Sequence, residues 1–202
     1  MHAAVSHPDW DCLYETAAAQ SGLFTTRQAG EAGYSSQLLA HHLLAGKVVR
    51  VQRGIYRLVH FPPGDHEELV TAWLWSDQAG VVSHETALSM HGISDALPTH
   101  VHLSMPLAWR HRRLRVPRGV VLHYEDVPST DRAWFGPVPI TNPSRTLNDC
   151  ALAGLSPELL ASAVQQALRR GLASPRDITH VERALAPFGG VQLPKSRQRR
   201  RV

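Results

Sequence analysis

The fold is decided by residues 35–59, SSQLLAHHLLAGKVVRVQRGIYRLV. Ser35 is a good N-cap, and the apolar residues after it recur at helical spacing, so the first part of this stretch predicts a helix that ends at Gly46. Two runs rich in β-branched residues, 48–52 and 55–59, follow on either side of Arg53-Gly54, a pattern typical of a β-hairpin. The stretch therefore predicts a helix followed directly by a hairpin.

Two more helices are predicted toward the N-terminus. Residues 9–21 show a helical pattern with Leu13, Ala17 and Trp10 on one face, and Gly22 ends it. The segment from Thr25 to Gln28 has the T-x-x-Q spacing of a capping box and opens a short helix that must stop by Gly33. Three helices followed by a hairpin predict a winged helix-turn-helix domain over residues 1–60.

A break at Phe61-Pro62-Pro63-Gly64 predicts a domain boundary, after which residues 65–188 predict a mixed α/β domain. Asp65 and Glu68 have capping-box spacing at the start of a helix with the apolar stripe 69–74, and Ser83 is placed to cap another helix that stops at Gly92. Three closing helices are predicted where a cap residue precedes proline, at 142–143, 156–157 and 174–175.

The sequence of the second domain also predicts a small sheet. Residues 100–105 alternate, with Val101, Leu103 and Met105 on one face and polar residues on the other, which is typical of a half-buried strand. A second strand is expected at 119–124, and a proline-rich edge strand at 136–141. The fold class is therefore α+β, with a winged helix-turn-helix followed by a small sheet and several helices.

The helix over 35–45 is the candidate recognition helix. Its outward face is small and polar and carries no acidic residue, and residues near the N-terminus of such a helix reach base edges in the major groove. The hairpin adds basic side chains, of which Arg53 at the tip is best placed for phosphate or the minor groove. The candidate DNA-binding residues are Ser35, Ser36, Gln37, Ala40, His41, Lys47, Arg50, Arg53 and Arg57. The alternative is a winged helix that serves only protein contacts.

Positive charge is most concentrated outside this domain. The net charge of +4 suits an anionic partner, because phosphate contacts supply most non-specific affinity for nucleic acid. A loop between the two predicted strands is a candidate second contact, as is the tail 189–202, basic at 195–201, which we expect to be disordered. The loop is equally consistent with a site for an acidic partner or with a plain solvated loop; its basic residues are Arg110, Arg112, Arg113, Arg115 and Arg118.

The sequence predicts no enzyme, metal or cofactor. His84-Glu85 lacks the second histidine of H-E-x-x-H, because position 88 is Leu88. His84 and His91 share a helix face and could bind a metal with His100 or His102, but no carboxylate or thiolate is spaced to complete the set. G-x-S-x-G and glycine-rich phosphate loops are absent from the sequence, and Ser83 is explained as a helix cap.

The same sequence predicts a cytoplasmic protein without membrane contact. No apolar run approaches the roughly 18 residues that a membrane span needs, and residues 1–8 lack the features of a secretory signal. The two cysteines, Cys12 and Cys150, are isolated, as in a reduced compartment. The oligomeric state stays open.

Several motifs carry a family resemblance through their order. In the first domain these are GLFTTRQA at 22–29, GKVVRV at 46–51 and RGIYRL at 53–58. Further motifs follow at 82–88, 91–92, 101–106 and 139–147. Together they make residues 9–152 resemble the AbiEi family of antitoxins.

The resemblance implies a transcriptional repressor that acts as the antitoxin of a type IV toxin–antitoxin operon. In that family the winged helix binds repeats in the promoter, and the C-terminal domain counters a nucleotidyltransferase toxin without requiring a stable complex. The family's DNA-binding positions carry over only to the recognition helix and wing. The alternatives are a protein-interaction module with a passive winged helix and the remnant of a nuclease-fused regulator.

Overall fold

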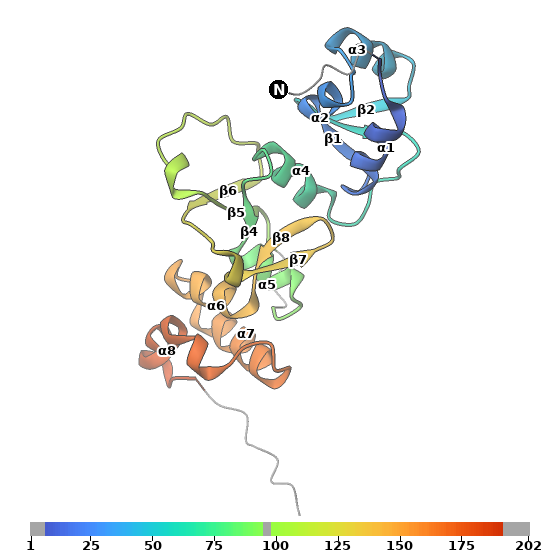
Figure 1. The fold of residues 1–202 in the computed structure, drawn as a ribbon. Coiled ribbons are helices and arrows are strands. Elements are labelled where there is room, and N and C mark those ends of the chain that lie inside the picture. Colours follow the sequence, from blue (N-terminus) through green and yellow to red (C-terminus); the bar gives the residue numbers. More distant parts are fainter. Residues whose placement is uncertain (1–6, 95–97, 192–202) are drawn as a thin grey trace, which may run out of the picture. The chain divides into compact units, whose positions relative to one another are not determined.

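The computed structural model describes residues 7–94 and 98–191 and confirms an α+β fold (Figure 1). The chain divides into two compact units: unit 1 contains the residues up to Gly80 and Gly136–Val138, and unit 2 contains Val81–Phe135 and the residues from Pro139. The predicted domain bounds of 1–60, 65–188 and 189–202 stay a prediction, and the basic segment at 195–201 lies outside the described residues. Among the described helices, none has the length and apolar character needed to cross a membrane.

Unit 1 begins with the predicted winged helix-turn-helix. The order is α1 (Trp10–Ala18), β1 (Leu23–Thr25), α2 (Thr26–Glu31), α3 (Ser36–Leu44), β2 (Val48–Gln52) and β3 (Ile55–Leu58). β3 lies between β1 and β2 and pairs antiparallel with both. The third strand, β1, was not predicted, because three residues are too few to show an alternating pattern.

Local capping explains where two of these helices begin. Thr25 Oγ1 accepts from the Gln28 N–H at 3.1 Å, and Gln28 Oε1 accepts from the Thr25 N–H at 2.8 Å, so the predicted capping box is confirmed. Ser35 Oγ likewise accepts from the Leu38 N–H at the start of α3. The core contains Leu13, Ala17, Phe24, Ala29, Leu39, Val48 and Leu58.

Two predictions in unit 1 need correction. Trp10 is 38% exposed rather than buried with Leu13, because the first turn of α1 places its ring against His42 at the surface. The helix α4 (Glu67–Trp75) does not begin with the predicted capping box: its N-cap is His66, in a left-handed conformation with φ 67°, and no side chain caps the helix. The predicted apolar stripe is confirmed, since every residue from Leu69 to Leu74 is buried.

Unit 2 is built on a mixed five-stranded sheet in the order β6-β5-β4-β8-β7. Its strands are β4 (Val81–Val82), β5 (Val101–Met105), β6 (Val120–Tyr124), β7 (Arg132–Phe135) and β8 (Val138–Thr141). β4 runs antiparallel to β5 and parallel to β8, and β5 and β6 run parallel in a continuous five-pair register.

The sheet also overturns two predictions. β8 lies between β4 and β7 instead of at an edge; its proline is tolerated because β4 is only two residues long and pairs with β8 through Val82 and Ile140. β5 is more than half-buried: Ser104, expected on the polar solvent face, is 1% exposed because Ser83 and Glu125 surround its hydroxyl.

The helices of unit 2 are α5 (His84–Met90), α6 (Pro143–Leu152), α7 (Pro157–Arg169) and α8 (Thr179–Leu185), with short 3-10 turns at Leu107–Trp109, Ser129–Asp131, Pro175–Asp177 and Ala186–Phe188. Asn142 and Ser156 cap α6 and α7 as predicted. Ser174 opens only a 3-10 turn, and α8 begins later at Thr179. A core between these helices contains Leu88, Ile93, Leu147, Leu160, Val164, Ile178 and Val181.

Ser83 occupies the predicted N-cap position of α5, but its hydroxyl makes no capping bond. It instead lies 2.8 Å from Ser104 Oγ and 2.9 Å from His84 Nδ1. The prediction that this serine acts as a helix cap is therefore wrong, because the hydroxyl joins a buried polar network.

Candidate nucleic-acid interface

The outward face of α3 carries the predicted recognition residues. Ser36, Gln37, Ala40 and His41 are all exposed, and their spacing places them together on one face of the helix. Ser35 is exposed as well, but its hydroxyl caps the helix. The opposite face buries Leu39 in the core of unit 1. α3 is therefore anchored by one side. Its outward side is small and polar over its first two turns, carries no carboxylate, and ends with the exposed Leu44.

His42 supports α3 from its inner side and was not predicted. Its ring lies 5.5 Å from Tyr34 and 6.2 Å from Trp10 between ring centroids. Burial lowers the pKa of His42, and the positive charges of Lys47 and His41 lower it further. The ring is therefore uncharged near neutral pH and serves as packing rather than as a phosphate contact.

The β2–β3 hairpin presents Lys47, Arg50 and Arg53 as exposed side chains. Arg53 stands in the turn, and Gly54 follows it with φ 79°, a left-handed conformation that glycine adopts without strain. The Thr26 N–H donates to the Gly54 carbonyl at 2.9 Å, so the turn is tied to the first residue of α2. The wing tip is thus held at a fixed place in the winged helix.

Arg57 is placed differently from the other predicted contacts. Its Nη1 donates to Glu67 Oε2 at 2.5 Å, and the two side chains are only 17% and 18% exposed. This ion pair fastens β3 to the start of α4. The guanidinium is therefore not part of the exposed basic group formed by the wing.

The predicted basic loop, 110–118, belongs to unit 2 and leads from the 3-10 turn at Leu107–Trp109 to β6. Arg110, Arg112, Arg113, Arg115 and Arg118 are all exposed. The Arg112 guanidinium carbon lies 4.0 Å above the Trp109 ring, a cation–π contact that orders one of the five.

Sequence reasoning missed an ionic network in unit 2. Arg145 of α6 contacts Glu125 at 2.6 Å, Asp131 at 3.2 Å and Asp149 at 2.7 Å. Burial is the main reason that the pKa of Asp149 rises to about 6, and the negative charge of Glu125 adds to it, while Arg145 opposes the rise. The i,i+4 spacing of Arg145 and Asp149 was the only sequence signal for this network.

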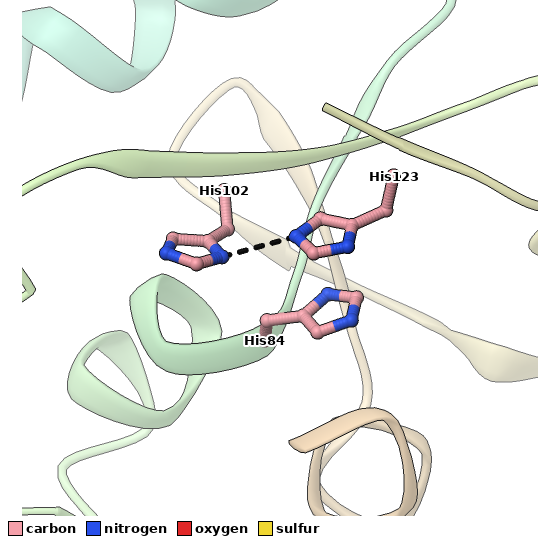
Figure 2. Close-up of side chains that lie close together, drawn as sticks. All are labelled: His84, His102 and His123. Carbon is pink, nitrogen blue, oxygen red and sulfur yellow. Dashed lines mark hydrogen bonds between the residues drawn. The ribbon is translucent and has the colours of Figure 1, made fainter. Parts of the chain in front are cut away.

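Three histidines of unit 2 gather beside this network (Figure 2). His102 Nδ1 and His123 Nε2 are 3.0 Å apart, and the His84 ring stacks on the His123 ring with 3.5 Å between centroids. Burial lowers the pKa of all three, that of His84 to about 3, so the rings are uncharged near neutral pH.

Of the four histidines weighed in the sequence as a group, the structure brings together two, His84 and His102. His91 is separate, with its Nε2 2.7 Å from the Thr141 carbonyl oxygen, and His100 is exposed beside Thr99. His123 was missed, because its place depends on the pairing of β5 with β6.

The family comparison concerns the winged helix. Residues 13–59 match the model of a family described as "Transcriptional regulator, AbiEi antitoxin". The AbiEi resemblance is confirmed over these residues. The AbiEi match runs from within α1 to just past β3, and so it includes α3 and the wing.

Among solved structures, the chain is similar to the crystal structure of the RV2827C protein from Mycobacterium tuberculosis. The two share 19% sequence identity, with 87% of this chain and 80% of that chain covered and a TM-score of 0.41. No curated protein matches the chain.

Proposed function

We propose that this protein is a DNA-binding transcriptional repressor in which α3 reads the major groove of promoter DNA and the wing contacts the backbone or the minor groove. The observation that carries the proposal is the exposed polar face of α3, free of carboxylates, in the same folded segment as a basic wing. The match of residues 13–59 to a family described as an AbiEi antitoxin and transcriptional regulator supports the same role.

Each proposed contact has its own chemistry. Gln37 can bond to both the N6 and N7 positions of adenine, and Ser36 can serve either base type. Lys47, Arg50 and Arg53 would neutralise phosphates. Each such contact makes the slope of log affinity against log salt more negative by about 0.9. Arg57 is not included, because Glu67 already occupies its guanidinium.

The test is binding of the purified full chain to the region upstream of its own gene, measured over a range of salt. Gln37→Ala should weaken specific binding by about fivefold to 150-fold, because a bidentate base contact is worth about 1–3 kcal/mol. Arg53→Ala should weaken specific and non-specific binding alike and reduce the salt slope by about 1. Arg176→Ala is the matched control, since this arginine is exposed in unit 2.

Two results would reject the proposal. One is an affinity and salt slope that stay intact when Gln37 and Arg53 are both replaced by alanine. The other is the absence of any mobility shift of the DNA at physiological salt, which is what a passive winged helix in an interaction module predicts.

The exposed arginines at 110–118 are proposed as a secondary contact. Their replacement by glutamine should make the salt slope less steep without changing sequence preference.

The AbiEi match also motivates a proposal for the whole chain: a cytoplasmic antitoxin, without catalytic activity, that represses its own type IV operon and counters a nucleotidyltransferase toxin. Co-expression tests it. The gene beside that of this protein should encode a nucleotidyltransferase, and the chain should relieve the growth arrest that this enzyme causes. Relief that also requires Gln37 and Arg53 would mean repression alone protects the cell, whereas no relief at all would reject the antitoxin role.

A further inference from the structure

The three clustered histidines come from three different elements of unit 2. His84 is the first residue of α5, His102 lies in β5 and His123 in β6. The parallel register pairs Ser104 with His123 and His102 with Val121, so His102, Ser104 and His123 share one face of the sheet. One nitrogen from each histidine lies within 4.8 Å of the other two.

The distances are near those of a coordination site. At a zinc–nitrogen distance of about 2.0–2.1 Å, tetrahedral ligands lie about 3.3 Å apart. His102 Nδ1 and His123 Nε2 are 3.0 Å apart and share one hydrogen-bonding proton (Figure 2). An ion to one side of the line that joins them would replace this proton, and both rings would turn until their lone pairs converge on the ion. His84, stacked on His123, would join by tilting its ring so that Nε2 faces the ion while Nδ1 keeps its hydrogen bond to Ser83.

A hydrogen-bonded chain orients His84. Ser104 Oγ is 2.9 Å from Glu125 Oε1 and 2.8 Å from Ser83 Oγ. A hydroxyl carries one proton and the carboxylate only accepts, so Ser104 donates to Glu125 and accepts from Ser83. Ser83 Oγ then accepts from His84 Nδ1–H at 2.9 Å, which leaves the lone pair of His84 on Nε2. Outer partners of this kind fix the tautomer of metal-binding histidines.

The backbone at His84 supports the same interpretation. Its φ is 52°, a left-handed conformation that is uncommon for a residue other than glycine. Such strain persists where the surrounding structure holds a side chain in a required place. Here it directs a buried imidazole toward the sheet at the start of α5.

A second group, His84 with Glu125 and Asp149, has similar spacing. Its two carboxylates already contact the Arg145 guanidinium at 2.6 and 2.7 Å, and a fixed positive charge there repels a second cation. Among the described residues, none of the three imidazoles is paired with a guanidinium, and the charge of Arg145 acts only on His84, as the weakest influence on its pKa. They are therefore the better donor set. Imidazole nitrogen selects zinc and neighbouring transition metals over magnesium or calcium.

We propose that His84, His102 and His123 bind one divalent transition-metal ion of the zinc class, which links α5, β5 and β6. Three protein ligands leave a fourth position for water or for another small donor. This site goes beyond the proposed function and does not depend on it, since it lies in unit 2 and the recognition helix lies in unit 1.

The experiment is titration of the full-length, tag-free, chelator-treated protein with Zn²⁺ by calorimetry and with Co²⁺ by visible absorption. We expect one ion per chain and cobalt bands of tetrahedral intensity. His102→Gln and His123→Gln should each weaken zinc binding at least a hundredfold, and Ser104→Ala about tenfold to a hundredfold through His84. His91→Gln and His100→Gln are matched controls that should bind as the wild type does.

A measurement of folding distinguishes the loss of a metal ligand from the loss of the folded structure. Circular dichroism should show each variant folded, and zinc should raise the Tm of the wild type but not that of His123→Gln. Three results would overturn the proposal. These are no binding of either metal, binding as tight in His102→Gln and His123→Gln as in the wild type, or binding lost in Glu125→Gln but kept in both histidine variants, which would favour the second group.

Discussion

Arg145 forms ion pairs with three carboxylates, so its replacement by methionine should strongly destabilise unit 2. Methionine keeps much of the apolar stem and removes the guanidinium that contacts Glu125, Asp131 and Asp149. Asp149 is the critical partner: it is 3% exposed, and among the described residues its Oδ2 already lacks a hydrogen-bond partner. Without Arg145 this buried carboxylate loses its compensating charge.

The magnitude follows from the burial of the three partners. Removing one member of a buried ion pair costs about 3–5 kcal/mol, whereas an exposed pair contributes about 0–1 kcal/mol. The Glu125 and Asp131 side chains are 30% and 34% exposed and can regain water, so most of the loss comes from Asp149. We expect the free energy of unfolding to fall by about 3–5 kcal/mol at neutral pH.

The loss should also depend on pH. Asp149 has a pKa of about 6 in the folded protein against 3.8 for a free side chain, so between these values the folded state binds more protons than the unfolded state. Its contribution is therefore favourable below about pH 4 and is lost as the pH rises through about 6. Removing Arg145 raises this pKa further, so the stability gap between wild type and variant should be larger at pH 8 than at pH 5.

Urea denaturation at both pH values, followed by circular dichroism, measures the gap. Arg176→Met is the matched control, because it removes an exposed arginine from the same unit and should change stability by less than about 0.5 kcal/mol. A gap below about 1 kcal/mol at pH 8, or one that is larger at pH 5, would refute the assignment of Arg145 as the compensating charge of Asp149.

Two further predictions concern other parts of the chain. Thr25→Ala should lower the stability of unit 1 by about 1 kcal/mol in thermal denaturation, because it removes the hydroxyl that caps α2, and Thr25→Ser should retain most of it. Burial lowers the pKa of His91, so the unfolded state binds the extra proton first and stability should fall as the pH drops below about 6.5, by at most about 1.4 kcal/mol per pH unit from this group. His91→Gln can still donate to the Thr141 carbonyl, and it should flatten the acid side of the stability profile; an unchanged profile would contradict the assignment.

The elements that could be predicted are those whose signal is local. Thr25, Ser35, Asn142 and Ser156 cap helices where their spacing predicted, because an N-cap bond joins residues only two or three apart. β1 and β4 could not be predicted, since strands of three and two residues exist only through pairing with distant partners. Ser83 was misassigned for the same reason: its bond to Ser104 crosses from one element to another.

The same distinction holds for the candidate sites. The exposure of Ser36, Gln37 and His41 follows from helical periodicity, and the exposure of Arg53 follows from its place in a hairpin turn. Arg57 shows the limit of prediction from local patterns. Nothing in the sequence of its strand indicated that its guanidinium would pair with the Glu67 carboxylate of α4. Of the three clustered histidines, His84 and His102 were considered together in the sequence, but His123 could not be predicted, since it meets His102 only through a parallel register.

The place of β8 has a consequence for how the chain folds. In the winged helix, β2 and β3 are neighbours in sequence, so their pairing closes a very short loop. The five-stranded sheet instead joins Val82 to Ile140, and this contact must wait until the intervening segment has been made and ordered. Contacts between residues far apart in sequence slow folding, so the recognition helix should be formed on the nascent chain well before the sheet of unit 2 closes.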